Sequence, residues 1–171
     1  MKILITGSPG TGKTTVARLL AKQLNYQVLN EKDFAAKNNI GFVNREKELE
    51  IPIKKFQAKL NNYLKKQDNV ILEGHVLCEA KLPADFVFVL TTDPVLLEKR
   101  LSKRKYKYLK ILDDVFCEET KYCLKKILEK YPKNKVFEVK NEKSLNLVIK
   151  RILNKLSNLK YVKKNKRGKN E

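Results

Sequence analysis

The stretch Gly7-Ser8-Pro9-Gly10-Thr11-Gly12-Lys13-Thr14-Thr15 decides the fold predicted for this chain. It satisfies the pattern G-x-x-x-x-G-K-[ST], and it stands between the apolar run Lys2–Thr6 and a segment with helical spacing of apolar residues. Glycines let the backbone curl so that successive N–H groups point at phosphate oxygens, and the following helix adds the positive end of its dipole. The pattern therefore predicts a phosphate-binding loop (P-loop) for a nucleotide.

The polar residues of this loop are expected to bind the phosphates and the magnesium ion of the nucleotide. Lys13 is expected to bridge the β- and γ-phosphates, and the Thr14 hydroxyl is expected to bind Mg²⁺ together with water. Thr15 would support the α-phosphate side. Gly10 and Gly12 would bring the backbone close to the nucleotide.

A second acidic element is expected at the end of a neighbouring strand. Residues 69–73 form an apolar run that ends in Glu73, whose carboxylate would organise Mg²⁺ or water. His75, the single histidine of the chain, follows two residues later. It is a candidate for orienting a water molecule, and the alternative is an ordinary hydrogen-bonded histidine.

Apolar runs alternate with amphipathic helical patterns along the rest of the chain. This alternation predicts an α/β fold with a five-stranded parallel sheet and helices on both faces. The predicted strands are residues 2–6, 26–29, 69–73, 86–91 and 135–139. The predicted helices are residues 14–24, a short piece at 33–38, then 53–64, 94–104, 113–130 and 144–156.

Composition excludes several classes of protein. The chain has 171 residues, enough for one domain, and a formal charge of +19 from 38 basic and 19 acidic residues. Such a charge favours binding to polyanions. The alternative explanation is a surface that is simply rich in solvated lysine. Neither a signal peptide nor a membrane-spanning run is evident, so we expect a cytoplasmic protein. Cys78, Cys117 and Cys123 form no CxxC pair, which predicts neither a thiolate zinc site nor a disulfide framework.

Two segments carry most of the excess charge. Residues 99–110 hold seven basic residues and no acid, and Arg100 and Arg104 lie one helical turn apart. At the mouth of a phosphate site these arginines could neutralise a migrating phosphoryl group, and otherwise they mark a solvated helix end. Residues 150–171 hold nine basic residues and one acid. Their last part, 160–171, is predicted to be a disordered tail that contacts RNA or only solubilises the chain.

Several of these segments together resemble one known family. The P-loop, the acid-x-His motif at Glu73–His75, and the segments FVLTTD (88–93), LEKRLSKRKY (97–106) and DDVFCEE (113–119) are similar to the small adenylate kinase-like NTPases of archaea and the eukaryotic nucleus. The similarity covers roughly residues 1–155. These proteins act in late maturation of the small ribosomal subunit.

The resemblance implies a three-layer nucleoside monophosphate (NMP) kinase fold over residues 1–159. It implies an NMP-binding insert at about residues 30–49, a short lid at about residues 103–113, and a loop around Asn141 that borders the adenine. It also implies adenylate kinase and ATPase activities with Mg-ATP, and ribosomal protein S11 and small-subunit RNA as partners. The ATP contacts it assigns are Gly10, Gly12, Lys13, Thr14, Thr15, Arg104 and Asn141.

The chain departs from ordinary adenylate kinases in two segments. Its insert has Lys37 where an Asp-Leu-x-Arg motif would supply an arginine, and Glu73–Leu77 stands in place of an Asp-Gly-Phe-Pro-Arg motif. Two arginines that clamp phosphates are therefore missing. Two alternatives stay open: a nucleotide-switched assembly factor with little kinase activity, and a kinase of another small molecule on the same fold.

Overall fold

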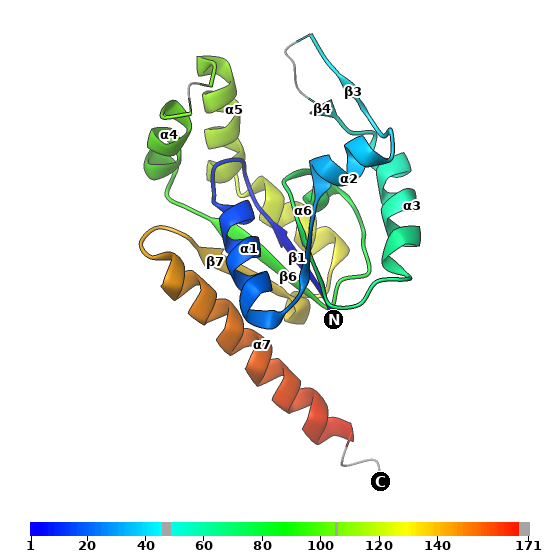
Figure 1. Cartoon of the computed structure of the whole chain (residues 1–171). Helices are drawn as coiled ribbons and strands as arrows, with labels where there is room; N and C mark the ends of the chain where they lie inside the picture. The colour runs from blue at the N-terminus through cyan, green and yellow to red at the C-terminus, as the bar shows by residue number, and fades with distance from the viewer. Residues whose placement is uncertain (46–48, 105, 168–171) are drawn as a thin grey trace.

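One parallel sheet organises the molecule, and the computed structural model describes residues 1–45, 49–104 and 106–167 (Figure 1). The sheet has five strands in the order β2-β5-β1-β6-β7, and every neighbouring pair is parallel. The predicted fold class is confirmed. The strands are β1 (Lys2–Thr6), β2 (Gln27–Asn30), β5 (Val70–Glu73), β6 (Phe86–Thr91) and β7 (Val136–Lys140).

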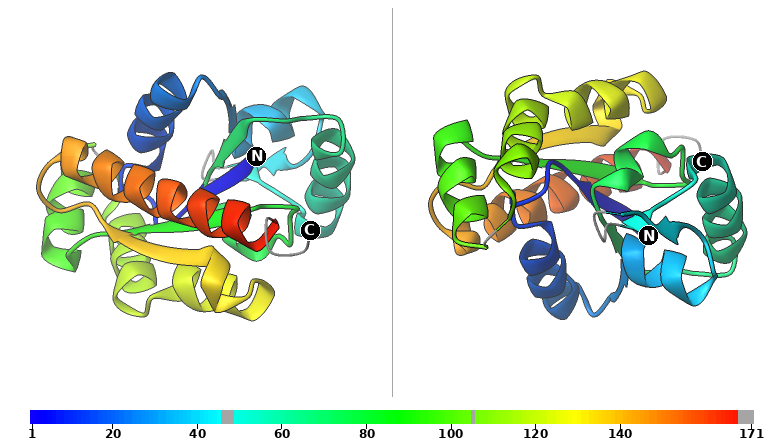
Figure 2. Two further views of the ribbon diagram at one scale, coloured as in Figure 1. Left: turned by 90° about the horizontal axis from the view of Figure 1, so that it is seen from below. Right: turned by 90° about the horizontal axis from the view of Figure 1, so that it is seen from above.

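Helices cover both faces of this sheet and make three layers (Figure 2). Ile3 and Ile5 of β1 pack with residues of α1 and α7, whereas Leu4 between them packs with residues of α3 and α6. This alternation is the two-residue period of a strand whose faces are both buried. The covering helices are α1 (Lys13–Leu24), α3 (Ile53–Leu64), α6 (Tyr122–Lys130) and α7 (Leu145–Arg167).

The lid segment and the helix predicted after it differ from expectation. The predicted helix 113–130 is two helices, α5 (Tyr108–Glu119) and α6, separated at Lys121, whose φ of 53° is left-handed. The Thr120 hydroxyl donates to the Phe116 carbonyl at 2.8 Å, which helps to end α5. Because α5 begins at Tyr108, half of the predicted lid 103–113 is helix, and α5 packs against α4 (Pro94–Ser102) as a hairpin.

The predicted insert contains structure that the sequence pattern does not reveal. After α2 (Glu31–Lys37), β3 (Phe42–Val43) and β4 (Leu49–Glu50) pair as an antiparallel ribbon. Strands this short are below the length at which alternation is readable. Residues 46–48 of the insert and Lys105 of the basic stretch lie outside the described residues. The ribbon and the α4–α5 hairpin project on either side of the end of the sheet where the P-loop lies (Figure 1).

The last helix is longer than predicted. The pattern ends it at residue 156, but α7 continues to Arg167, so residues 160–167 are helical where a disordered tail is expected. The extra turns are rich in lysine and asparagine, and their few apolar residues do not continue the helical spacing from which the helix is predicted. Residues 168–171 lie outside the described part of the chain. Among the described residues no helix combines the length and apolar character that a membrane crossing requires.

Candidate active site

The P-loop adopts a conformation that only glycine permits at key positions. Gly10 has φ of 86°, and a Cβ there would lie 2.6 Å from the Leu97 side chain of α4. Gly12, with φ of 92°, precedes α1, and a Cβ there would lie 2.5 Å from the Asn141 amide nitrogen. Side chains are excluded by both conformation and space. The two glycines thus let α4 and the loop after β7 pack directly on the P-loop.

Lys13 lies at the centre of the loop, and its side chain is buried. Its ammonium donates to the carbonyls of Gly7 and Ser8, both at 2.9 Å. Burial lowers the pKa of Lys13 from its usual value, and the negative charge of Glu31 is the largest opposing influence. The cation is thus held inside the loop, where a phosphate would compete with the two carbonyls for it.

Thr14 and Glu73 meet beside this lysine, as the sequence predicts for two magnesium-organising groups. The Thr14 hydroxyl lies 3.1 and 3.2 Å from the two carboxylate oxygens of Glu73, which is 1% exposed. The Asn30 amide donates to the same carboxylate at 2.5 Å. β2, β5 and α1 supply these groups at the carboxyl end of the sheet. Hydroxyl and carboxylate oxygens are ligands that Mg²⁺ prefers, directly or through water, so the residues present fit this ion.

Glu31 is a buried acid of the site that the sequence analysis missed. Its carboxylate accepts the backbone N–H groups of His75 at 2.8 Å and Leu77 at 3.0 Å. Burial raises the pKa of Glu31 to about 7, and the charge of Lys13 opposes that rise. A Cβ on Gly74 would lie 2.1 Å from this carboxyl group. The position of Glu31 directly after β2 could have indicated a role in the site, because β2 ends at the same edge of the sheet as β5.

His75 turns its ring toward the protein interior. Its Nδ1 lies 3.2 Å from the Gly7 carbonyl and 3.4 Å from the Cys123 sulfur. Burial lowers the pKa of His75, and the charge of Lys13 lowers it further. Because Nδ1 contacts these two groups, a water molecule oriented by His75 would have to hydrogen-bond to the other ring nitrogen, Nε2.

Asn141 closes the P-loop from the other side of the sheet. Its side-chain amide donates to the Thr11 carbonyl at 2.8 Å, and its backbone carbonyl accepts from the Arg100 guanidinium at 2.8 Å and the Thr92 hydroxyl at 3.2 Å. Arg100 thus holds the loop that carries Asn141. The structure places Asn141 against the P-loop and Arg100 against the backbone of Asn141, while their roles toward ATP stay predictions.

Helix α5 packs its acidic and thiol side chains against the phosphate loop. The Ser8 hydroxyl donates to the Cys117 sulfur at 3.4 Å, and Glu118 accepts the Thr92 N–H at 2.7 Å. Burial raises the pKa of Glu118. These residues belong to the segment 113–119 that carries part of the family resemblance, although their contact with the P-loop is visible only in the fold.

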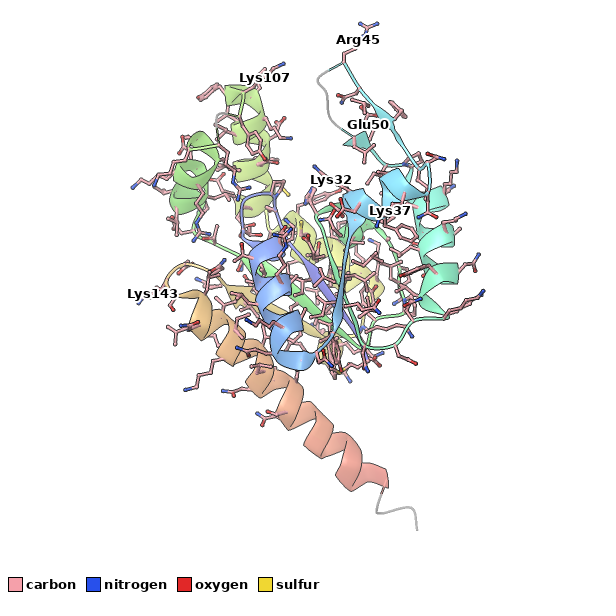
Figure 3. All side chains as sticks on the ribbon, viewed as in Figure 1. Lys32, Lys37, Arg45, Glu50, Lys107 and Lys143 are labelled. Carbon is pink, nitrogen blue, oxygen red and sulfur yellow. The ribbon has the colours of Figure 1, made fainter. Side chains whose placement is uncertain are left out.

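The other residues predicted for the site lie on α1 and on the two projecting arms. Thr15 and Arg104 are exposed, and Arg104 follows the α4 residues that pack on Gly10. In Figure 3, Lys107 marks the tip of the α4–α5 hairpin, while Lys37 lies on α2 and Arg45 on the end of the β3–β4 ribbon. Basic side chains thus stand on both arms.

Solved structures with a similar fold define the class. The fold resembles shikimate kinase from Acinetobacter baumannii (TM-score 0.66, 22% identity, covering 92% of this chain and 93% of that one). It also resembles deoxyadenosine kinase from M. mycoides with bound dATP (TM-score 0.60, 18% identity, 92% and 100% covered). The fold, together with the G-x-x-x-x-G-K-[ST] loop and the meeting of Thr14 with Glu73 at one edge of the sheet, defines the class as a P-loop protein with a kinase-type α/β fold.

Sequence comparison narrows this class. Residues 3–121 match the family described as "AAA domain". A protein of Thermococcus kodakarensis named "Putative adenylate kinase" is 37% identical over 129 residues, 75% of this chain and 71% of that protein. One of Methanococcus maripaludis with the same name is 32% identical over 161 residues, 90% and 87% of the two chains. This chain belongs to the adenylate kinase-like NTPases of the AAA domain family.

Proposed function

We propose that this protein transfers a phosphoryl group from Mg-ATP to a nucleoside monophosphate, with intrinsic hydrolysis of ATP as a side activity. The observation that carries the proposal is the arrangement of Lys13 and Thr14 at the P-loop with Glu73 of β5 beside them, in a kinase-type fold. The relatives named as adenylate kinases support a nucleotide as the acceptor.

The residues of the loop have separable tasks in this reaction. Backbone N–H groups of the P-loop would hold the phosphates, and Lys13 would leave the Gly7 and Ser8 carbonyls to neutralise the transferred group. Thr14, with water and Glu73 behind it, would hold Mg²⁺, which supplies charge neutralisation between the β- and γ-phosphates. Asn141 would border the adenine from the loop after β7.

The acceptor would lie between the two projecting arms. Arg104 and its basic neighbours on the hairpin would approach the phosphates when that arm moves inward, and Lys37 would meet the acceptor phosphate from α2. Closure over an NMP excludes water and favours transfer. Without an acceptor, a water molecule oriented by Nε2 of His75 would attack the γ-phosphate instead, and ADP and inorganic phosphate would leave.

The experiment that tests this function is ADP production from ATP, measured with and without AMP, CMP or dAMP. We expect stimulation by at least one NMP, and we expect Lys13→Ala to abolish the stimulated and basal rates, by at least about 100-fold. His75→Ala should lower hydrolysis more than transfer. If the wild type hydrolyses ATP and no NMP changes the rate or becomes phosphorylated, the kinase assignment is wrong.

A nucleotide-switched role in small-subunit maturation is the second proposal. The observation that favours it is the basic character of residues 150–171 together with the course of α7, whose C-terminal end, up to Arg167, extends beyond the sheet (Figure 1). Counterion release by this segment would add salt-dependent affinity for RNA. Removing residues 160–171 should weaken binding to small-subunit RNA and flatten its salt dependence, whereas binding of ribosomal protein S11 would be measured separately. Unchanged RNA affinity would rule the segment out.

A further inference from the structure

Three metal-ligating side chains from separate parts of the sequence meet beside the P-loop. They are His75 and Cys78, which flank the start of the short 3₁₀ helix η1 (Val76–Glu79), and Cys123 of α6. Their donor atoms all lie within 4.8 Å of one another, and Nδ1 of His75 is 3.4 Å from the sulfur of Cys123. Cys78 is 0% and Cys123 is 3% exposed.

A fourth donor lies at the edge of this cluster. Cys117 of α5 is half-buried and close enough to Cys123 that a hydrogen bond between the two side chains is the main cause raising the pKa of the Cys117 thiol. The break between α5 and α6 at Lys121 turns the two helices so that both cysteines reach the same place. Cys117 therefore neighbours Cys123 at the edge of the compact group formed by His75, Cys78 and Cys123.

The spacing of these donors is compatible with coordination of one metal ion. In a tetrahedral zinc site, bonds of about 2.1 Å to nitrogen and 2.3 Å to sulfur place the donor atoms about 3.6 to 3.8 Å apart. The nitrogen–sulfur separation of 3.4 Å already matches, and the 4.8 Å limit for the set requires a contraction of about 1 Å. His75 and Cys78 also have the x₂ spacing common between zinc ligands.

We propose that His75, Cys78 and Cys123 bind one zinc ion, with Cys117 completing a Cys₃His set. Soft thiolates and a neutral imidazole select a d¹⁰ ion of this kind over magnesium. Each coordinating thiol would give its proton to solvent, so binding through three cysteines releases three protons. The imidazole of His75 would bind the ion in its neutral form, with Nδ1 free of its proton.

This zinc site would be coupled to the nucleotide site without sharing residues with the magnesium position. Nδ1 of His75 also contacts the Gly7 carbonyl, and Cys117 accepts the Ser8 hydroxyl. Coordination through Nδ1 would put the ring proton on Nε2 and free the Gly7 carbonyl for Lys13 alone. Zinc occupancy would thereby constrain the first turn of the P-loop.

The test uses the full chain, purified reduced and without added metal, and measures zinc per chain and cobalt spectra. We expect the wild type to retain one zinc ion per chain, and the metal-free protein to give thiolate-to-cobalt charge-transfer bands that zinc abolishes. Cys78→Ser and Cys123→Ser should each lower bound zinc below about 0.1 ion per chain, and Cys117→Ser should weaken affinity by about 10- to 100-fold.

Lys125→Ala is the matched control, because it alters an exposed position of the helix that carries Cys123 and leaves every donor in place. It should bind zinc as the wild type does. Far-ultraviolet circular dichroism of each cysteine variant shows whether it is folded, and the double variant Cys78→Ala, Cys123→Ala provides an apolar replacement if a serine variant unfolds. Equal zinc binding by folded cysteine variants, absence of thiolate bands with cobalt, or a disulfide that leaves one free thiol in the unreduced protein would each overturn the proposal.

Discussion

The amide of Asn141 donates a hydrogen bond to the carbonyl of Thr11 at 2.8 Å, across 130 residues of sequence. The loop after the last strand is thus tied to the phosphate loop after the first, and Gly12 leaves the space in which that amide lies. This contact fixes the distance between the P-loop and the segment expected to border the base. The hydrogen bond lies inside the protein, beside the nucleotide site, since Asn141 is only 6% exposed.

Asn141→Ala should weaken ATP binding and lower stability by about 1 to 2 kcal/mol, because the Thr11 carbonyl loses its donor in a buried place. Asn141→Asp should be worse, since a carboxylate would face that carbonyl. Isothermal titration with ATP and urea unfolding check both effects. Asn146→Ala, at an exposed position of α7, is the control and should change neither quantity.

Gly74→Ala should destabilise the protein by about 1 to 3 kcal/mol, because the new Cβ would overlap the Glu31 carboxyl group. The matched measurement is a double-mutant cycle in urea. In a Glu31→Ala background the same alanine should cost much less, since the obstructing carboxyl is gone. Equal costs in both backgrounds would show that Glu31 is not the obstacle.

Glu31 should make stability fall as the pH rises from about 4.5 to above 7. Its pKa in the folded protein, about 7, lies above the value of 4.5 for a free side chain, so the folded state holds the proton more tightly. The contribution of Glu31 to the free energy of unfolding, at most about 3 kcal/mol, is fully present below pH 4.5 and is lost as the pH rises through 7. Unfolding curves of Glu31→Gln should lack this component, whereas exposed Glu98→Gln should keep it.

Thr14→Val should raise the Mg²⁺ concentration needed for activity and lower kcat/KM by at least about tenfold, because the hydroxyl beside Glu73 is removed at nearly constant volume. Thr14→Ser keeps the hydroxyl and should stay near the wild-type value. Steady-state rates over a magnesium titration separate the two variants. A valine variant with an unaltered magnesium dependence would contradict the assigned position.

Arg100 and Arg104 should differ in what their removal changes. Arg100→Ala should lower the melting temperature and weaken ATP binding, because its guanidinium holds the Asn141 carbonyl. Arg104→Ala, at an exposed position, should leave the melting temperature unchanged and reduce turnover. Thermal melts and steady-state kinetics of both variants make the comparison, and the reverse pattern would exchange the two roles.

The local sequence pattern was enough to predict the P-loop and the parallel sheet of this protein. The run from Lys2 to Thr15 by itself determines a buried strand, a glycine turn and a helix start, because each requirement is met by neighbouring residues. The chemistry of Lys13 and Thr14 follows from that same stretch. The parallel sheet is also readable, since β1, β5 and β6 are apolar on both faces.

Only the tertiary structure decided which distant side chains complete the site. Glu31, Asn141 and Glu118 lie on separate connections, and the parallel sheet brings them to one edge because all its strands end there. The left-handed turn at Lys121 likewise gathers cysteines whose spacing in the sequence predicts no metal site. Sequence periodicity records which face of an element is buried, and contacts between elements depend on how those faces are stacked.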